Sequence, residues 1–296
     1  MDTKYYEVAG HQFQVTGEEK DLALMKNYEP FALAPARVRP ASVFALAIAE
    51  GASVDYTEEL RQSEECEEIV CGYAQRGAER LPVFEFRWTD QTAGWLICSP
   101  DYEQGQLTLT GHTRQLAIDN ALMVLYALAT ARKNTALFHS STVSHDGVAY
   151  LFLGKSGTGK STHARLWLQY IGGCMLVNDD NPVVRVADDG RATVYGSPWS
   201  GKTPCYKNVS FPLGGIVMLS QAPYNKIRRL DGLEAYAVLV PSISGKRWDA
   251  AIADGLHATE NALASHVPAW HLACRPDEEA ARLCETTISN STFPPF

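Results

Sequence analysis

The segment 148–170 constrains the fold of this chain more than any other part of its sequence. An apolar stretch at 148–153 is followed by the glycine-rich sequence GKSGTGKS at 154–161, and then by apolar residues at helical spacing. A strand, a loop of the form G-x-x-x-x-G-K-[S/T] and a helix in this order direct backbone N–H groups and a helix N-terminus toward phosphate oxygens. The sequence therefore predicts a phosphate-binding loop at 154–162 and a helix that begins near Lys160.

The expected ligand of this loop is a nucleoside triphosphate with Mg²⁺. Lys160 would place its charge beside the β- and γ-phosphates, and the hydroxyl of Ser161 would ligate the metal ion. ATP is the expected nucleotide, with GTP and ADP as alternatives. The expected nucleotide-binding residues are Gly154, Lys155, Ser156, Gly157, Thr158, Gly159, Lys160, Ser161 and Thr162.

Two adjacent carboxylates, Asp179 and Asp180, follow the apolar stretch 174–177. Acids that follow a strand downstream of a phosphate-binding loop can ligate Mg²⁺ and can accept the proton of an attacking hydroxyl. The residues alone leave open which acid has which role, and adjacent acids titrate as a coupled pair. A plain turn before Pro182 is the alternative interpretation, because Asn and Asp favour turns.

Five other residues are candidates for the site or for the core. His139 lies at the start of the hairpin that leads into the loop, and we expect it to belong to the site. His145 and His163 are interpreted as surface or packing residues. Lys202 lies on an irregular segment rich in Ser, Gly and Pro, where it either faces a substrate or is a surface lysine. Trp199 is interpreted as a core residue rather than a stacking platform.

The second half of the chain contains two tight-turn signals, Asp146-Gly147 and Asp189-Gly190, each between two strand-like stretches. Common folds with a phosphate-binding loop have helices where these hairpins lie, so we expect a mixed sheet instead of a parallel one. The expected elements are strands at 141–144, 148–153, 183–186, 192–195, 215–219 and 270–274, and helices at 233–240, 248–266 and 277–288.

The first hundred residues read as short strands and turns, with strands expected at 83–88, 95–98 and 106–110. At 113–132 apolar residues recur at helical spacing, and this helix is expected to lead the chain into a second domain. We therefore expect a β-rich N-terminal domain of unknown role at 1–112 and a nucleotide-binding domain at 113–296. The expected fold class is α/β, with a mixed sheet of the α+β kind.

Composition excludes several classes of partner. The net charge of −8 opposes a phosphate backbone, so nucleic acid is not an expected partner. No stretch approaches the ~18 to 20 apolar residues of a membrane span, and the N-terminus does not resemble a signal peptide. The seven cysteines are scattered without a C-x-x-C pair, so we expect reduced thiols in a cytoplasmic protein.

Together, Phe138-His139-Ser140, the turn Asp146-Gly147, the loop 154–162 and the segment 177–181 resemble one family. They are similar to the catalytic domain of HPr kinase/phosphorylase and its relatives in the ATP-dependent phosphoenolpyruvate carboxykinase-like superfamily. The resemblance spans about residues 135–200, and 196–219 looks like related serine-kinase-like proteins. The N-terminal third does not resemble the usual N-terminal domain of HPr kinase.

The resemblance implies roles for individual residues. Lys160 and Ser161 would be the phosphate and metal residues, Asp179 the general base, and Asp180 its metal-side or hydrogen-bonding neighbour. His139 matches the family's active-site histidine, which completes an expected catalytic set of Asp179, Lys160 and His139 and a metal set of Ser161 and Asp180. The family's later arginine has two candidates here, Arg247 and Arg228.

The implied activity is transfer of the γ-phosphoryl group of Mg·ATP to a hydroxyl acceptor, namely serine, free or in a protein. A carboxykinase-type lyase and a non-catalytic nucleotide-sensing module are the alternatives. A phosphorylase back-reaction and assembly into a homo-oligomer stay open at this point.

Overall fold

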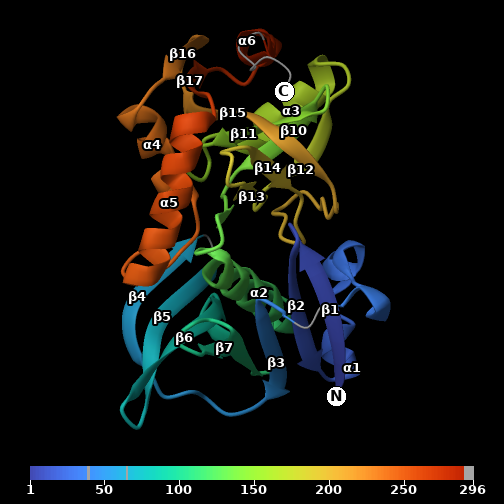
Figure 1. Cartoon of the computed structure of the whole chain (residues 1–296), viewed down its shortest axis with the longest axis vertical. Coiled ribbons are helices and arrows are strands. Elements are labelled where there is room, and N and C mark those ends of the chain that lie inside the picture. Colours follow the sequence, from blue (N-terminus) through green and yellow to red (C-terminus); the bar gives the residue numbers. More distant parts are fainter. Residues whose placement is uncertain (39–40, 65, 290–296) are drawn as a thin grey trace. The chain divides into compact units, whose positions relative to one another are not determined.

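The computed structural model describes residues 1–38, 41–64 and 66–289, which form two compact units. Unit 1 is Met1–Thr130 and unit 2 is Ala131–Phe296. Both units contain a mixed sheet with helices packed on it, so the chain has a mixed α/β fold, as predicted (Figure 1).

Unit 1 is built on an eight-stranded sheet with the order β1-β2-β3-β8-β7-β6-β5-β4. Strands β2 and β3, and β3 and β8, pair in parallel, whereas the other neighbours are antiparallel. The terminal strands of the sheet are therefore β1 and β4. The strands are β1 (Asp2–Val8), β2 (His11–Gly17), β3 (Phe44–Glu50), β4 (Thr57–Glu64), β5 (Glu67–Arg76), β6 (Glu79–Trp88), β7 (Gln91–Cys98) and β8 (Gln104–Leu109).

Helix α2 (Arg114–Thr130) confirms the helical spacing predicted at 113–132, but it belongs to unit 1. It packs on β3, β6, β7 and β8, and the Tyr126 hydroxyl donates to the Val8 carbonyl at 3.0 Å. The expected domain boundary after residue 112 is thus replaced by one after Thr130. The apolar period of a helix shows that one face is buried, but not which sheet covers that face.

Three short helices in unit 1 lie between β2 and β3. They are α1 (Glu19–Leu22) and the 3₁₀ helices η1 (Lys26–Phe31) and η2 (Pro35–Arg37). The chain touches β1 again just after η1, where Ala32 forms a bridge with Tyr6. The structure thus places this connection beside the outer edge of β1.

Unit 2 contains a nine-stranded sheet with the order β12-β10-β11-β15-β14-β13-β9, and with β17 beside β15 and β16 beside β17. Its strands are β9 (Thr135–Leu137), β10 (Ser141–His145), β11 (Val148–Leu153), β12 (Met175–Asn178), β13 (Val183–Val186), β14 (Ala192–Tyr195), β15 (Ser210–Gln221), β16 (Lys226–Leu230) and β17 (Ala269–Cys274). Its helices are α3 (Lys160–Tyr170), α4 (Leu233–Leu239), the 3₁₀ helix η3 (Val240–Ser242), α5 (Ala250–His266) and α6 (Glu278–Ser289).

Both predicted hairpins are confirmed. Strands β10 and β11 are antiparallel, and Asp146 and Gly147 between them have φ of 49° and 79°, which a two-residue hairpin turn of type I′ requires. Strands β13 and β14 are also antiparallel. Because β15 pairs in parallel with β11 and with β17, the sheet is mixed, as predicted.

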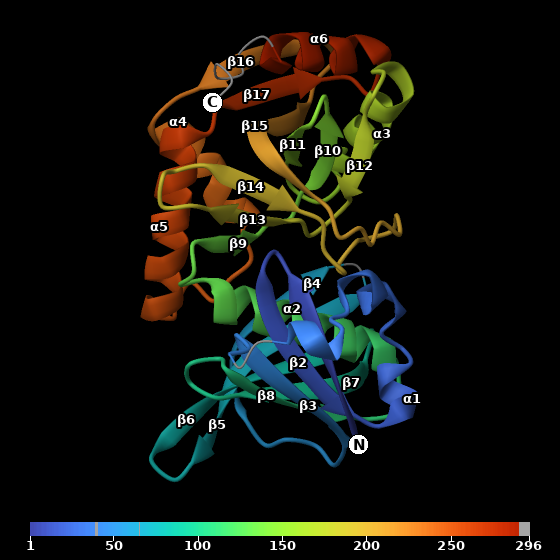
Figure 2. The same ribbon diagram turned by 45° about the vertical axis from the view of Figure 1, so that its right-hand side comes forward.

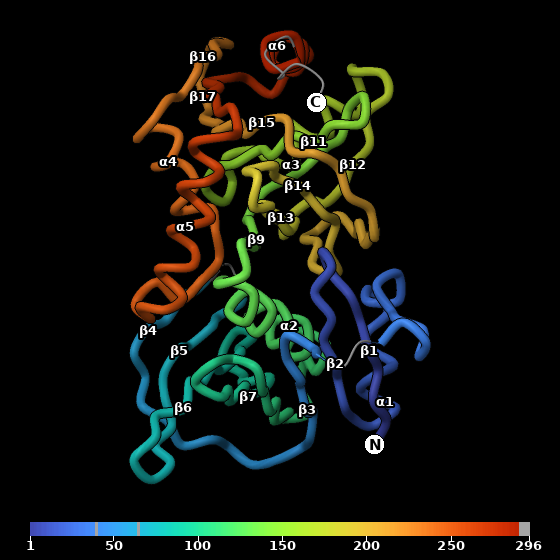
Figure 3. Tube along the Cα trace, viewed as in Figure 1, coloured from blue at the N-terminus to red at the C-terminus, as the bar shows by residue number. Residues whose placement is uncertain are grey.

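The core of unit 2 lies between the sheet and two of its helices. Helix α3 packs on β10, β11 and α6, and α5 packs on β9, β13 and α4 (Figure 2). The largest fully buried side chain of this core is Trp167, whose ring lies beside those of Tyr150 and Phe152. The apolar face of α3 thereby fixes the helix on β10 and β11. Figure 3 traces the path of the chain from β11 through the loop into α3.

Two general features complete the description. Within the described part of the chain, no helix combines the length and apolar character needed to cross a membrane. None of the seven cysteines is part of a disulfide bond.

Candidate active site

The predicted phosphate-binding loop connects β11 directly to α3 in unit 2. Gly154 and Gly159 have φ of 153° and 105°, a region that favours glycine over other residues. A Cβ atom at Gly154 would lie 3.1 Å from Cβ of Thr158, so the loop also closes tightly on itself. These glycines explain why the chain turns sharply and then starts a helix at Lys160, as predicted.

Lys160 lies in the first turn of α3 and its side chain is folded back over the loop. Its Nζ donates to the carbonyl of Gly154 at 3.0 Å, and it is half-buried. Ser161 and Thr162 follow in the same turn and are also half-buried, and no acidic residue lies in that turn. The first turn of this eleven-residue helix therefore carries a cationic side chain and no acidic residue of its own, which favours an anion.

The two acids follow a strand end at the same edge of the sheet. Strand β10 is antiparallel to both β11 and β12, so β11 and β12 run in the same direction. The loop at 154–159 follows the end of β11, and Asp179 and Asp180 follow the end of β12. Ligands of open α/β sheets bind at such carboxyl ends, so this edge is the candidate active site.

Asp179 and Asp180 have different surroundings. Asp179 is 8% exposed, and its Oδ1 accepts a hydrogen bond from the Ser141 hydroxyl at 2.6 Å. The side chain of Asp180 is 30% exposed, and its Oδ1 lies 3.1 Å from Nδ1 of His139. Its Oδ2 accepts from Nδ2 of Asn181 at 2.8 Å. Asp179 is thus enclosed and bonded to a serine, whereas Asp180 is more accessible and paired with a histidine.

The turn that carries the acids is held by Asn178, which is fully buried. Its Oδ1 accepts from the backbone N–H groups of Asp180 and Asn181 at 2.9 and 2.8 Å. Its Nδ2 donates to the hydroxyl of Ser197 and to the carbonyl of Trp199, both at 3.1 Å. The segment is therefore a turn, as the alternative interpretation held, and it is also the element that presents both carboxylates.

The irregular segment 196–203 packs against this turn. Trp199 is 4% exposed, which confirms it as a core residue. A Cβ atom at Gly201 would lie 3.2 Å from Cβ of Asp180, so the backbone of the segment runs close to the more accessible acid. Lys202 is exposed and follows Gly201 directly, so the structure places the chain at Lys202 near the candidate site.

His139 lies between β9 and β10 and is held by a segment from much later in the chain. Its backbone N–H donates to the carbonyl of Ser242 at 2.7 Å, and Phe138 forms a bridge with Ile243. The last residue of η3 and the residue that follows it therefore position the histidine that faces Asp180. Nothing in the sequence around Ser242 signals this role.

The two candidate arginines are engaged elsewhere. Arg247 donates to Oε1 of Glu260, which is fully buried, at 2.6 Å and to the carbonyl of Val240 at 2.7 Å. Arg228 pairs with Glu234 at 2.7 and 2.8 Å on the surface, which lowers the pKa of that carboxyl. These contacts assign both arginines to packing and surface ion pairs.

Gln221 was not expected in the site. It ends β15, the strand next to β11, and its Nε2 donates to the Gly157 carbonyl at 3.1 Å. A glutamine at the end of a predicted strand carries no signal by itself, because only the strand order brings it beside the loop.

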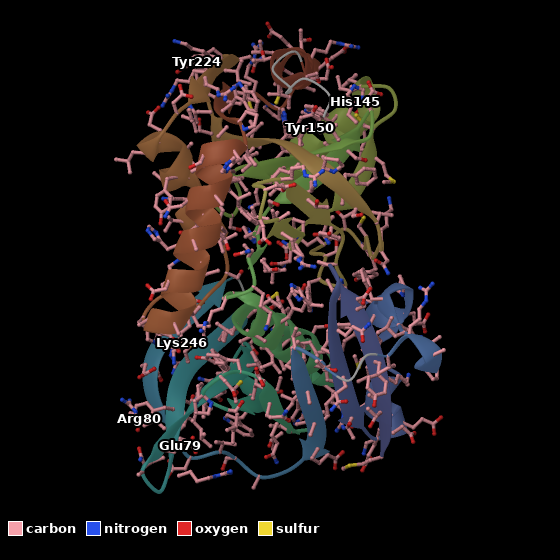
Figure 4. The ribbon with its side chains drawn as sticks, viewed as in Figure 1. Glu79, Arg80, His145, Tyr150, Tyr224 and Lys246 are labelled. Carbon is pink, nitrogen blue, oxygen red and sulfur yellow. The ribbon has the colours of Figure 1, made fainter. Side chains whose placement is uncertain are left out.

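The other two candidate histidines, His163 and His145, have packing roles, as predicted. His163 is buried, which lowers its pKa to about 4, and its Nε2 accepts from Nε1 of Trp167 at 3.1 Å. His145 lies at the turn of the β10–β11 hairpin, at the opposite end of β11 from the loop, with its ring 6.3 Å from that of Trp167 (Figure 4).

No protein-family model matches this chain, and no curated protein matches it. The class of the protein therefore rests on its own fold and site. It is a mixed α/β protein in which a glycine-rich loop and an acidic pair lie at one edge of a mixed sheet.

Proposed function

We propose that this chain is an ATP-dependent phosphotransferase of the HPr kinase-like type, which transfers the γ-phosphoryl group of ATP to a hydroxyl. The observation that carries the proposal is the arrangement at the ends of β11 and β12. A loop with Lys160 and a helix N-terminus lies at the same sheet edge as a carboxylate pair. Anion binding and proton acceptance are the two functions that phosphoryl transfer requires of the protein.

In this proposal the loop binds the triphosphate. Backbone N–H groups at 154–160 and the N-terminus of α3 surround the phosphates, and Lys160 leaves its contact with Gly154 to reach the β- and γ-phosphates. Gln221 holds the loop at Gly157, which keeps the loop ordered before the nucleotide arrives. This preorganisation reduces the conformational entropy lost on binding.

The residues proposed to hold Mg²⁺ are Ser161 and Asp180. A hydroxyl and a carboxylate are the oxygen ligands that Mg²⁺ takes, and Asp180 is the more accessible of the two acids. The ion would neutralise charge on the phosphate oxygens. His139 and Asn181 each contact one carboxylate oxygen of Asp180, so they hold its orientation.

Asp179 is the proposed general base. It accepts the proton of the acceptor hydroxyl while that oxygen forms a bond to the γ-phosphorus, and the bond from phosphorus to the β–γ bridging oxygen breaks to release ADP. The Ser141 hydroxyl holds one oxygen of this carboxylate. Most of the rate enhancement would come from positioning and charge neutralisation.

The hairpin before the loop supports the finer proposal for the fold. A β10–β11 hairpin leading into the loop, with β12 on the other side of β10, fits a phosphoenolpyruvate carboxykinase-like domain better than a sheet of βαβ crossovers. The proposed acceptor is a serine hydroxyl, free or in a protein.

A labelling experiment tests the proposal. The purified chain is incubated with γ-labelled ATP, Mg²⁺ and a panel of acceptors that includes free serine and proteins. Asp179→Asn and the matched variant Asp189→Asn, at an exposed hairpin turn, run in parallel. We expect the wild type and Asp189→Asn to transfer label to an acceptor, and Asp179→Asn to transfer none. Binding of ATP without transfer to any acceptor would instead favour a nucleotide-sensing module.

A further inference from the structure

A cavity of about 630 Å³ lies in unit 1 beside β1, the terminal strand of its sheet. One wall is the start of β1, and the others are α1, η1 and η2 with the residues between them. Its lining includes Leu22, Met25 and Tyr6, which are each at most 3% exposed. The cavity thus combines an apolar floor with the edge of a β-sheet.

The outer edge of β1 is already paired over part of its length. The Leu33 N–H donates to the Tyr5 carbonyl at 2.8 Å, and Ala32 forms an antiparallel bridge with Tyr6. The chain then leaves the edge and enters η2 at Pro35. A segment of this protein therefore already pairs with the outer edge of β1 at one position, and its residues Ala32 and Leu33 also line the cavity.

The remaining outer edge offers backbone hydrogen bonds. Successive residues of a strand direct their N–H and C=O groups to opposite edges, and the Tyr5 carbonyl points outward to Leu33. The N–H and C=O groups of Thr3 and the N–H of Tyr5 consequently point outward as well. Within residues 1–38, 41–64 and 66–289, no backbone group is bonded to them.

Charge at the cavity is positive although the chain as a whole is acidic. Lys4 and Lys26 line it and are exposed, and among the described residues no carboxylate pairs with either. Glu29 is the one acid in the lining. The lining thus carries more positive than negative charge, which favours an acidic ligand at this strand edge although the whole chain has a net charge of −8.

We propose that this cavity binds an extended, acidic peptide segment of a protein partner, which adds to β1 as a further strand. The backbone of the peptide bonds to Thr3 and Tyr5, one apolar side chain enters the floor at Leu22 and Met25, and acidic side chains contact Lys4 and Lys26.

A proline at Thr3 tests the outer edge of β1 alone, because it leaves the rest of the fold unchanged. The Thr3 N–H points away from β2, so a proline there removes an outward donor and leaves the β1–β2 ladder intact. Thr3→Ala is the matched control, because it also loses the contact between the Thr3 and Thr16 hydroxyls but keeps the N–H group. Equal urea midpoints for the two variants would show that both fold.

The test uses a displayed library of short peptides with acidic or basic residues alternating with apolar ones. Acidic members are expected to be enriched on the wild type and on Thr3→Ala, and Thr3→Pro should weaken the best member about tenfold, as measured by fluorescence polarisation. The double variant Lys4→Glu/Lys26→Glu should favour basic members instead. Enrichment of basic peptides on the wild type, or equal binding by Thr3→Pro and Thr3→Ala, would overturn the proposal.

Two further outcomes separate this proposal from others. A concentration-dependent dimer that Thr3→Pro abolishes, with no peptide enriched, would assign the edge to a second copy of the chain and overturn peptide docking. Binding needs no phosphoryl transfer, so enrichment of acidic peptides without any labelled acceptor would support the docking surface while contradicting the proposed function.

Discussion

Nδ1 of His139 lies 3.1 Å from Oδ1 of Asp180, so a histidine that precedes the glycine-rich loop is paired with the second of two adjacent acids. Its neighbour Asp179 is held instead by Ser141. This asymmetry separates two carboxylates that the sequence presents as equivalent, and it underlies the proposed division into a metal ligand and a base.

The first prediction concerns this pair. Replacing His139 by Asn should lower kcat/KM for phosphoryl transfer by about tenfold to a hundredfold, because residues that orient a metal ligand typically contribute that much. The dependence on Mg²⁺ concentration should shift to higher values. His145→Asn is the matched control, since His145 lies at the hairpin turn, at the opposite end of β11 from the glycine-rich loop. Equal losses in the two variants would contradict a role for the pair.

The second prediction concerns the charge at the loop. Lys160→Ala should reduce kcat/KM on the order of a few hundredfold, which corresponds to about 3 to 4 kcal/mol of transition-state stabilisation. Steady-state assays with labelled ATP measure the effect, and Lys226→Ala, at an exposed position on β16, is the control. Unchanged turnover in Lys160→Ala would remove the basis of the proposed chemistry.

The third prediction concerns Asn178, the buried centre of the acidic turn. Asn178→Ala leaves two backbone N–H groups without their acceptor, so we expect the free energy of unfolding to fall by about 2 to 4 kcal/mol. Urea unfolding followed by tryptophan fluorescence measures this. Asn225→Ala, which removes bonds at a more exposed position, should cost less. A smaller loss for Asn178 than for Asn225 would show that the turn is held by other contacts.

The fourth prediction concerns pH. Burial lowers the pKa of His163 to about 4 from 6.5, so folding favours the neutral ring. The contribution of His163 to the free energy of unfolding is fully present above pH 6.5. It is lost as the pH falls toward 4, by about 3 kcal/mol in total, because the ring becomes protonated in the unfolded chain first. His163→Gln keeps an acceptor for Trp167 but does not titrate. The difference in unfolding free energy between wild type and variant should therefore change across this range, and parallel pH profiles would rule the effect out.

Several local elements were predictable because short-range geometry determines them. The β10–β11 hairpin follows from Asp146-Gly147, whose positive φ suits that turn. The loop and the start of α3 follow from Gly154, Gly159 and the apolar residues behind them. Such signals involve neighbours in the chain, so one sequence is enough to detect them.

Other features were missed or wrong because they depend on partners that are distant in the sequence. Helix α2 was expected in the second domain, yet the sheet of unit 1 buries it. Arg247 was a candidate for the family's later arginine, yet the buried carboxylate of Glu260 binds it. The apolar face of α2 fits a sheet in either unit, and an arginine fits either a candidate site or a buried ion pair. The neighbouring residues in the sequence therefore could not show which partner each one has.

By itself, the sequence determined that a glycine-rich loop joins a strand to a helix and that an acidic turn follows downstream. Glycine φ angles and apolar spacing are properties of the local chain. Only the tertiary structure decided that Ser141 holds Asp179, that His139 holds Asp180 and that Gln221 holds Gly157. These contacts join separate strands, and the order of strands in a sheet is set by burial of whole faces rather than by any single residue.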